Sequence, residues 1–261
     1  MKIKCNGIEL QYVVEGSGPW VVMSHSLACD ATMWDEQARV LGRDHRVLRF
    51  DTRGHGGSDA PEGGYTLEML ADDAKGLLDG LGIRSCHWVG LSLGGMIGQT
   101  FALKYPGIFK TLTLCDTASS YGPEAAQMWQ ERISTANEKG MAALVEATLG
   151  RWFTEPFRQS RKDTMERVSK MIRNTPVAGY AGCCHAIPKL NLTHRLKEIR
   201  CPTLVLVGEQ DMATPVAAAR EIHSAVTGAE LVIIPSAAHL SNIEQAEAFN
   251  RALLDFLARH R

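Results

Sequence analysis

The 261-residue sequence lacks the features that mark membrane, secreted and nucleic-acid-binding proteins. No apolar run approaches the length of a bilayer-spanning helix, and residues 1–7 lack the apolar core of a signal peptide. Lys plus Arg (28) almost balances Asp plus Glu (29), so no excess of charge favours nucleic acid or a membrane surface. We therefore expect a soluble, cytoplasmic protein whose partner is a small molecule, and the composition leaves a homo-oligomer open.

The seven cysteines form neither a disulfide framework nor a metal motif. Their number is odd, they are scattered, and no two stand in a C-x-x-C spacing. Cys183 and Cys184 beside His185 resemble a fragment of a metal site, but adjacent side chains on one helix or turn diverge. We expect small buried thiols and no metal. The glycine-rich stretch Arg53–Ser58 lacks the Gly-Lys-Ser/Thr of a phosphate loop.

What the sequence does contain is an alternation of short apolar runs and amphipathic segments, with a hydrophobic content of 45%. This pattern is typical of one α/β domain with a mostly parallel sheet and helices on both faces. Thr66 is expected to cap a helix whose apolar residues share one face, and Asp30 or Thr32 to cap an earlier one. Strands are predicted at 8–14, 20–23, 46–51, 87–89, 111–116, 202–208 and 230–234, and helices at 33–41, 67–81, 93–105, 215–226 and in the last 20 residues.

The alternation stops between residues 119 and 197, where no convincing strand occurs. We predict that this segment is an all-helical lid, inserted before the last two strands into a core of residues 1–118 and 198–261. Its large apolar side chains either fill the core of a helical bundle or line an apolar pocket under the lid, and Trp129 and Trp152 are candidates for the pocket. The expected lid helices are 124–138, 141–152, 157–174 and 180–187.

The pentapeptide Gly90–Gly94 reads Gly-x-Ser-x-Gly and stands between a strand-like run and a helix-like run. That context predicts a sharp strand-to-helix turn with Ser92 at its tip. A side chain at either flanking glycine is expected to clash with neighbouring backbone. The free N–H groups of the following helix would face any developing negative charge. Ser92 is therefore a candidate nucleophile.

Two further residues follow strands of the predicted sheet and supply an acid and a base. Open parallel sheets place their ligand sites beyond the carboxyl ends of the strands, and Asp211 and His239 fall there with Ser92. The order Ser…Asp…His is the one expected for this type of hydrolase. Asp211 is preferred to Glu209 because the short loop after Gly208 places it past the strand end. Among the other histidines, His87 is expected to be packed in a strand, His45, His223 and His260 to lie on the surface, and the roles of His185 and His194 in the lid stay open.

The predicted chemistry also requires an oxyanion hole. One donor should be the backbone N–H of Leu93, and the other that of Leu27, with Ser26 as the alternative. His25 is either a structural brace of this loop, which the pattern favours, or a substrate contact, and Ser26 is a further candidate for the substrate pocket. His55, in the glycine-rich loop, is expected to bond to backbone.

The pentapeptide around Ser92, with Asp211 and His239, resembles the serine-type α/β-hydrolase family. Five stretches extend the resemblance: Asp51–Gly56, Gly90–Gly95, Arg151–Thr154, Gly179–Cys184 and Ala238–Glu244. Together they resemble the bacterial 3-oxoadipate enol-lactonases. The resemblance implies an esterase or lactonase of aromatic-compound degradation that needs no cofactor. Two departures keep the substrate open: His25 stands where the family has asparagine, and Pro188 stands where it has an arginine.

Other activities share this set of residues. A carboxylesterase of different specificity, a C–C hydrolase, a perhydrolase and an acyltransferase all use a serine triad. A ligand-binding receptor on the same fold is disfavoured by an intact triad. Dehalogenase and epoxide hydrolase chemistry is disfavoured because those relatives have aspartate at the position of Ser92.

Overall fold

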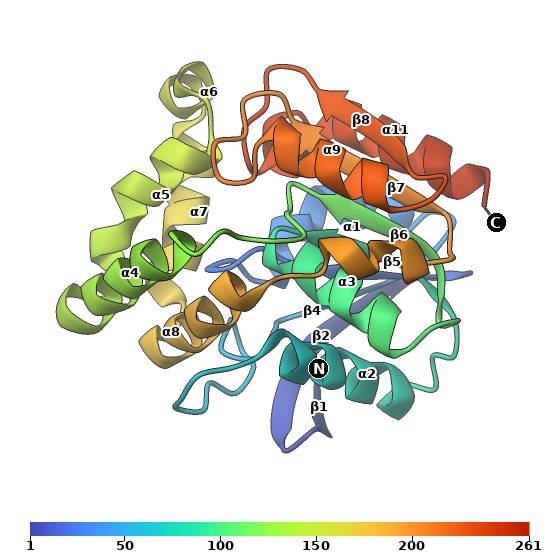
Figure 1. Ribbon diagram of the computed structural model, residues 1–261, viewed down its shortest axis with the longest axis horizontal. Coiled ribbons are helices and arrows are strands. Elements are labelled where there is room, and N and C mark those ends of the chain that lie inside the picture. Colours follow the sequence, from blue (N-terminus) through green and yellow to red (C-terminus); the bar gives the residue numbers. More distant parts are fainter. Residues whose placement is uncertain (261) are drawn as a thin grey trace.

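The computed structural model describes residues 1–260 and contains one eight-stranded sheet covered by helices on both faces (Figure 1). The strand order is β1-β2-β4-β3-β5-β6-β7-β8, and every pair from β4 to β8 is parallel. The predicted α/β-hydrolase fold class is confirmed. The strands are β1 Lys2–Cys5, β2 Ile8–Gly16, β3 Trp20–Ser24, β4 Arg46–Phe50, β5 Cys86–Leu91, β6 Phe109–Cys115, β7 Thr203–Gly208 and β8 Glu230–Ile234.

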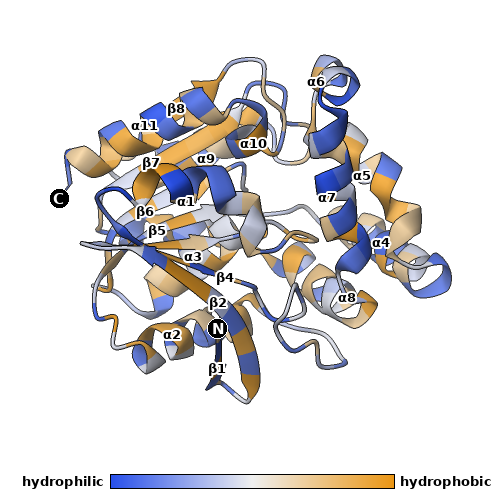
Figure 2. Ribbon diagram, turned by 180° about the vertical axis from the view of Figure 1, so that it is seen from behind, coloured by the Kyte–Doolittle hydropathy of each residue, from blue (hydrophilic) through white to orange (hydrophobic). Residues whose placement is uncertain are grey.

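The edge strand β1 was not predicted from the sequence. Its burial alternates between exposed and intermediate positions, so no apolar run marks it. It forms an antiparallel hairpin with β2, which in turn pairs antiparallel with β4. The central strands β5 and β7 are buried at every position, because helices cover both of their faces. In Figure 2, β7 is accordingly coloured hydrophobic along its length.

The helices of the core lie in two layers. Figure 1 shows α2, α3 and α9 in front of the sheet, with α1 and α11 behind it. Thr66 caps α2 by accepting from the Met69 N–H at 3.0 Å, and Asp30 caps the turn before α1, as predicted. These helices are η1 Ala31–Trp34, α1 Asp35–Leu41, α2 Leu67–Gly80, α3 Leu93–Lys104, α9 Val216–Ala225, α10 Ser241–Glu244 and α11 Ala246–Ala258.

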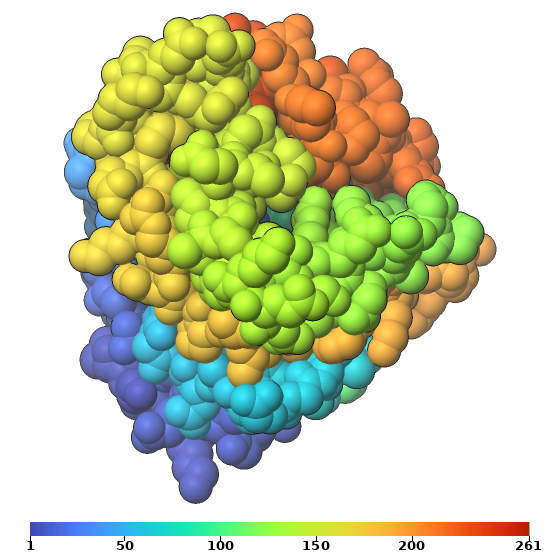
Figure 3. Space-filling view, turned by 90° about the vertical axis from the view of Figure 1, so that its left-hand side faces the viewer, coloured from blue at the N-terminus to red at the C-terminus, as the bar shows by residue number. Residues whose placement is uncertain are grey.

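The segment between β6 and β7 forms a helical insertion at one end of the sheet (Figure 1). In Figure 3 its yellow-green helices rise beside the orange C-terminal part of the chain, and the surface between them is hollowed. The insertion consists of α4 Ala125–Lys139, η2 Met141–Leu144, α5 Val145–Trp152, α6 Glu155–Ser160, α7 Lys162–Asn174, α8 Val177–Ala186 and η3 Ile187–Lys189. The turn η4 Thr193–Glu198 follows it and packs against α3 and α9 of the core.

Two predicted helices are each divided in the structure. The stretch 157–174 is broken at Arg161, whose φ of −118° and ψ of 62° end α6 and precede α7. The closing helix is broken at Gln245, whose φ of −126° and ψ of 53° separate α10 from α11. Hydrophobic periodicity could not predict these breaks. At each break only one residue is non-helical, and the apolar face of the helix resumes after it. Ile243 is half-buried rather than part of the buried face.

Some predictions of exposure were wrong. His45 is buried, with 6% exposure, because it directly precedes β4 and its ring meets His87 edge-on at 6.2 Å between centroids. Cys5 and Cys201 are only half-buried, whereas the other five cysteines are buried, and all seven are free. Among residues 1–260, no helix has the length and apolar character that crossing a membrane requires.

Candidate active site

Ser92 lies at the sharp turn between β5 and α3. Its φ of 54° and ψ of −112° are unusual for a residue with a side chain. The surroundings hold it there: its N–H donates to the Cys115 carbonyl at 2.9 Å, and its carbonyl accepts from Thr117 Oγ1 at 2.8 Å. A strained backbone that its neighbours hold in place is characteristic of functional positions.

The glycines that flank Ser92 are required by close backbone contacts. A Cβ atom at Gly90 would stand 2.2 Å from the Gly94 carbonyl oxygen, and one at Gly94 would stand 2.1 Å from the Ser24 carbonyl oxygen. Both distances are far below van der Waals contact, and the obstructing atoms are backbone. The steric reason predicted for the pentapeptide therefore applies at both glycines.

The predicted base and acid are in contact. His239 Nδ1 lies 2.9 Å from Asp211 Oδ2, and both side chains are buried. Thr214 donates its hydroxyl to the same carboxylate oxygen at 2.7 Å and its N–H to the other at 3.0 Å. Burial opposes ionisation of Asp211, but its interactions with His239 and Thr214 outweigh this and lower the pKa of the carboxyl group. The lowered pKa favours the ionised form of Asp211, whose carboxylate is bonded to Nδ1 of the imidazole.

The loop after β3 is braced from the core. His25 Nε2 accepts from the Thr52 N–H at 2.9 Å, and its Nδ1 lies 2.7 Å from the Ser26 carbonyl oxygen. Because both ring nitrogens are occupied and the side chain has 0% exposure, His25 is a brace, as the sequence favoured. It does not line the cavity, so the alternative of a substrate contact is not supported. His55 Nε2 accepts from the Ala28 N–H at 3.0 Å, so the predicted bonding of His55 to backbone is confirmed.

Burial and the neighbouring His25 lower the pKa of His55 to about 3, which keeps its Nε2 an acceptor at neutral pH. The brace therefore holds Ala28 at a φ of 60° and shapes the turn that carries Leu27. Among residues 1–260, the N–H groups of Leu27 and Leu93 have no hydrogen-bond acceptor. That leaves them available to an external acceptor, and their role as an oxyanion hole stays a prediction.

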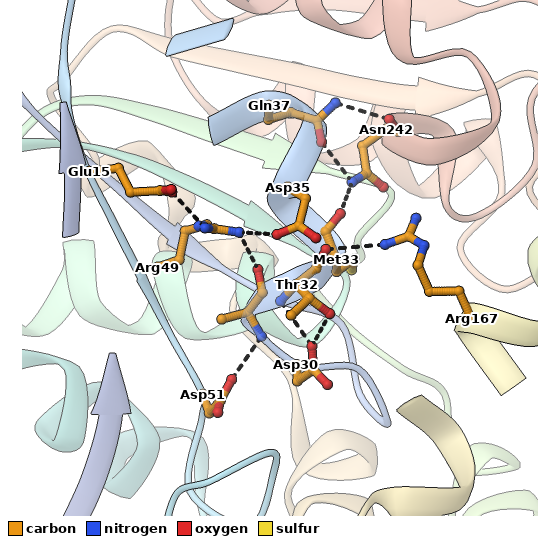
Figure 4. Close-up of polar contacts among 11 residues, drawn as sticks. Glu15, Asp30, Thr32, Met33, Asp35, Gln37, Arg49, Asp51, Arg167 and Asn242 are labelled. Atoms are coloured by element: carbon orange, nitrogen blue, oxygen red, sulfur yellow. Dashed lines mark hydrogen bonds and ion pairs between the residues drawn. The ribbon is translucent and has the colours of Figure 1, made fainter. Parts of the chain in front are cut away.

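Figure 4 shows how the chain beyond this turn is anchored. Asp51 accepts from the Ala31 N–H at 2.8 Å. Arg167, from α7 of the insertion, donates to the Thr32 carbonyl at 3.3 Å, so the insertion also contacts the core here. Asn242, three residues after His239, donates to the Met33 carbonyl at 3.2 Å. The loop after β3, the insertion and the segment that follows His239 therefore converge on η1. Figure 4 also draws Arg49 between Glu15 and Asp35, and Gln37 beside Asn242.

Ser92 and His239 line one cavity of about 150 Å³ between the sheet and the insertion. Trp129 and Trp152 line it as predicted, with the Trp152 ring 6.2 Å from the His239 ring. Ser26 also lines it, and neither its hydroxyl nor Trp129 Nε1 has a hydrogen-bond partner within residues 1–260. The remaining walls are mostly apolar: Leu27, Ala28, Met96, Met128, Met141, Leu144, Ile172, Ile187, Met212 and Ala213, with Tyr121, Thr148, Tyr180 and Thr214.

Two arginines of the insertion line the same cavity and were not predicted. Arg132 stacks on the Trp129 ring at 4.5 Å, and Arg151 reaches Thr148 Oγ1 at 3.4 Å. Neither arginine forms an ion pair within residues 1–260, and no acidic side chain lines the cavity. Burial and the neighbouring Arg132 lower the pKa of Arg151. Two uncompensated cations in an apolar cavity favour an anionic ligand.

Asp116 is a second buried carboxyl group that sequence reasoning missed. It follows β6, next to the strand that carries Asp211, and it accepts from the Gly208 N–H at 2.8 Å and from Ser241 Oγ at 2.5 Å. Burial and the charge of Asp211 raise its pKa well above the usual value. Its position at the end of a predicted strand was the only sequence signal for a buried functional group. Its hydrogen-bond partners, Gly208 and Ser241, lie far away in the sequence and could not be predicted.

Known proteins resemble the chain over almost all of its length. The alpha/beta hydrolase fold family matches residues 19–246. The chain belongs to the α/β-hydrolase family. 3-Oxoadipate enol-lactonase 2 of Acinetobacter baylyi is 33% identical over 248 residues, which cover 94% of this chain and 92% of that protein.

Two solved α/β hydrolases have the same fold and similar sequences. The enol-lactonase of Burkholderia xenovorans superposes with a TM-score of 0.95 at 39% identity, over 99% of this chain and 100% of that one. A thermophilic esterase of Thermogutta terrifontis, solved with malate bound, has a TM-score of 0.95 at 31% identity, over all of both chains. This chain is accordingly an α/β hydrolase whose relatives act on esters and lactones.

Proposed function

We propose that this α/β hydrolase cleaves a carboxylic ester or lactone that carries an additional anionic group, through an acyl-enzyme on Ser92, and that 3-oxoadipate enol-lactone is its substrate. One observation carries the proposal. The cavity that Ser92 and His239 line is also lined by Arg132 and Arg151, and by no acidic side chain of residues 1–260.

Acylation begins when Ser92 Oγ attacks the substrate carbonyl carbon. His239 Nε2 takes the hydroxyl proton, and Asp211, bonded to Nδ1 at 2.9 Å, stabilises the imidazolium. The N–H groups of Leu27 and Leu93 receive the oxyanion, and each such donor typically lowers a barrier by about 3–4 kcal/mol. The tetrahedral intermediate then expels the ring or ester oxygen, which takes the proton from His239.

Deacylation repeats these steps with water. His239 removes a proton from the water as its oxygen attacks the acyl carbon, and the same two N–H groups bind the second oxyanion. Collapse of this intermediate breaks the bond to Ser92 Oγ, which recovers its proton from His239. The ester or lactone plus one water therefore yields a carboxylic acid and an alcohol or enol, with the protein unchanged.

The arginine pair supports an acid-bearing substrate. Adipate is a dicarboxylate, so its enol-lactone retains one free carboxylate after one carboxyl group has closed the ring. The arginine that the lactonases have at the position of Pro188 is missing here, but Arg132 and Arg151 supply positive charge from other helices of the insertion. The related esterase was solved with malate, another dicarboxylate.

The test is hydrolysis of 3-oxoadipate enol-lactone by the purified protein, followed by the loss of lactone absorbance. We expect efficient turnover by the wild type and none above background by Ser92→Ala. A matched Ser160→Ala variant, on an exposed turn of α6, should keep full activity. Turnover that survived Ser92→Ala would refute the mechanism, whereas hydrolysis of simple esters but not of the lactone would refute only the substrate.

A further inference from the structure

A buried carboxylate joins the insertion to the segment that carries His239. Glu244 has 6% exposure and ends α10, five residues after His239. Its Oε2 accepts from the Ala238 N–H at 2.8 Å, and its Oε1 accepts from the N–H and the hydroxyl of Thr154 at 3.0 and 2.5 Å. One side chain thus bonds the residue before His239 and the junction between α5 and α6.

The residue after His239 is tied to the same junction. The Leu240 N–H donates to the Trp152 carbonyl at 3.1 Å. Trp152 lines the catalytic cavity, and its ring lies 6.2 Å from the imidazole. Both chain neighbours of His239 are therefore held against residues 152–154, one directly and the other through Glu244.

The Asp211 hydrogen bond alone leaves the imidazole incompletely positioned. It fixes the tautomer and one ring nitrogen, but rotation of the backbone of residues 238–240 would still move Nε2 relative to Ser92. In catalysis a displacement of about 1 Å can lower a rate by roughly 100-fold. Charge-assisted hydrogen bonds are the strongest available in proteins, and three of them converge on Glu244.

We propose that Glu244 is a positioning residue for His239, which locks the histidine segment and the α5–α6 junction of the insertion into one unit. The insertion thereby contributes to the placement of the base as well as to the wall of the cavity. This inference rests on the proposed role of His239 as the base for Ser92. Glu244 itself does not line the cavity, so its effect is transmitted through Ala238 and Thr154.

The test compares Thr154→Val, Glu244→Gln and the double variant. Valine removes one donor to Glu244 with little change in shape. The amide of glutamine keeps one acceptor oxygen but turns an NH2 group toward a backbone N–H that needs an acceptor. With 4-nitrophenyl acetate we expect kcat to fall about 10-fold in Thr154→Val and about 100-fold in Glu244→Gln, with KM within about twofold. The double variant should be no slower than Glu244→Gln, because both substitutions break one connection.

Reaction with a fluorophosphonate provides a second measurement. The Oγ–P bond forms at Ser92 as fluoride leaves and His239 takes the proton, so inactivation should slow in parallel with kcat. The matched controls are Thr135→Val on α4, whose hydroxyl bonds only within its helix, and Glu247→Gln, whose side chain is 97% exposed. Both controls should retain wild-type rates.

Two results would overturn the proposal for Glu244. One is wild-type kcat and inactivation rates in Thr154→Val and Glu244→Gln, and the other is a change confined to KM. If Glu244→Gln fails to fold, kcat and the inactivation rate of the folded Thr154→Val variant test the proposal alone, and wild-type values of both would overturn it. Ester hydrolysis that persists in Ser92→Ala would instead overturn the proposed function, so the two failures are distinguishable.

Discussion

The sharpest prediction concerns the two arginines of the cavity that Ser92 and His239 line. Replacing Arg151 by methionine keeps the length and much of the apolar contact of the side chain and removes its charge. Because Arg151 is half-buried and has no ion-pair partner within residues 1–260, a substrate carboxylate would be its first full charge partner. A hydrogen bond to a charged group contributes about 1.5–3 kcal/mol, which corresponds to about 10- to 150-fold in kcat/KM.

The assay uses two chromogenic esters of similar size, anionic 4-nitrophenyl hemisuccinate and neutral 4-nitrophenyl butyrate. We expect Arg151→Met to lose about 10- to 150-fold in kcat/KM for the anion and to stay within about threefold for the neutral ester. Arg132→Met should lose less, because Arg132 also stacks on Trp129 and that contact orients it without a ligand. Arg173→Met, at an exposed position of α7 and paired with Glu166, is the matched control.

Stability provides an internal check of the same reasoning. Burial and Arg132 lower the pKa of Arg151, which means that its charge is unfavourably placed in the absence of an anion. Arg151→Met should therefore leave the melting temperature unchanged or raise it. Equal losses on both esters, or a clear fall in melting temperature, would refute the assignment of Arg151 to a substrate carboxylate.

Two further predictions concern the catalytic pair and the buried histidines. Asp211→Asn should lower kcat on 4-nitrophenyl acetate by about 10³- to 10⁴-fold without loss of fold, because the amide cannot stabilise the imidazolium, and a loss below tenfold would contradict the triad. Burial lowers the pKa values of His55 and His87 to about 3 and about 4. Unfolded histidine binds a proton near pH 6.5, so the free energy of unfolding should fall by about 1.4 kcal/mol per pH unit for each as pH drops from 6.5 toward 4. Urea unfolding at pH 7.5 and 5.5 measures this, exposed His223→Gln should not change the slope, and a flat profile would contradict it.

Local sequence carried enough information to predict the strands and turns that position the candidate site residues. Ser92, Asp211 and His239 each follow a strand of the parallel part of the sheet, and the carboxyl ends of parallel strands meet at one edge of a sheet. The glycines around Ser92 reflect contacts within a few residues or with the adjacent strand. Apolar periodicity likewise predicted seven of the eight strands, and it missed β1 because a half-exposed edge strand has no apolar run.

The positions that give the cavity its character depended on packing between distant segments. Arg132 and Arg151 look like ordinary surface residues of amphipathic helices, and only the docking of the insertion turns them inward to the cavity that contains Ser92. Glu244 is one of many glutamates in helical sequence, and its burial against Thr154 joins residues 90 positions apart.

By itself, therefore, the sequence determined the fold class and the order of the predicted nucleophile, acid and base, because hydrophobic periodicity and strand-end motifs are local. Only the tertiary structure decided which charged side chains line the cavity and that His25 braces the loop after β3 instead of contacting a ligand. It also decided how the insertion is hydrogen-bonded to the segment that contains His239. Those features depend on side chains brought together across the fold, and no spacing along the chain encodes them.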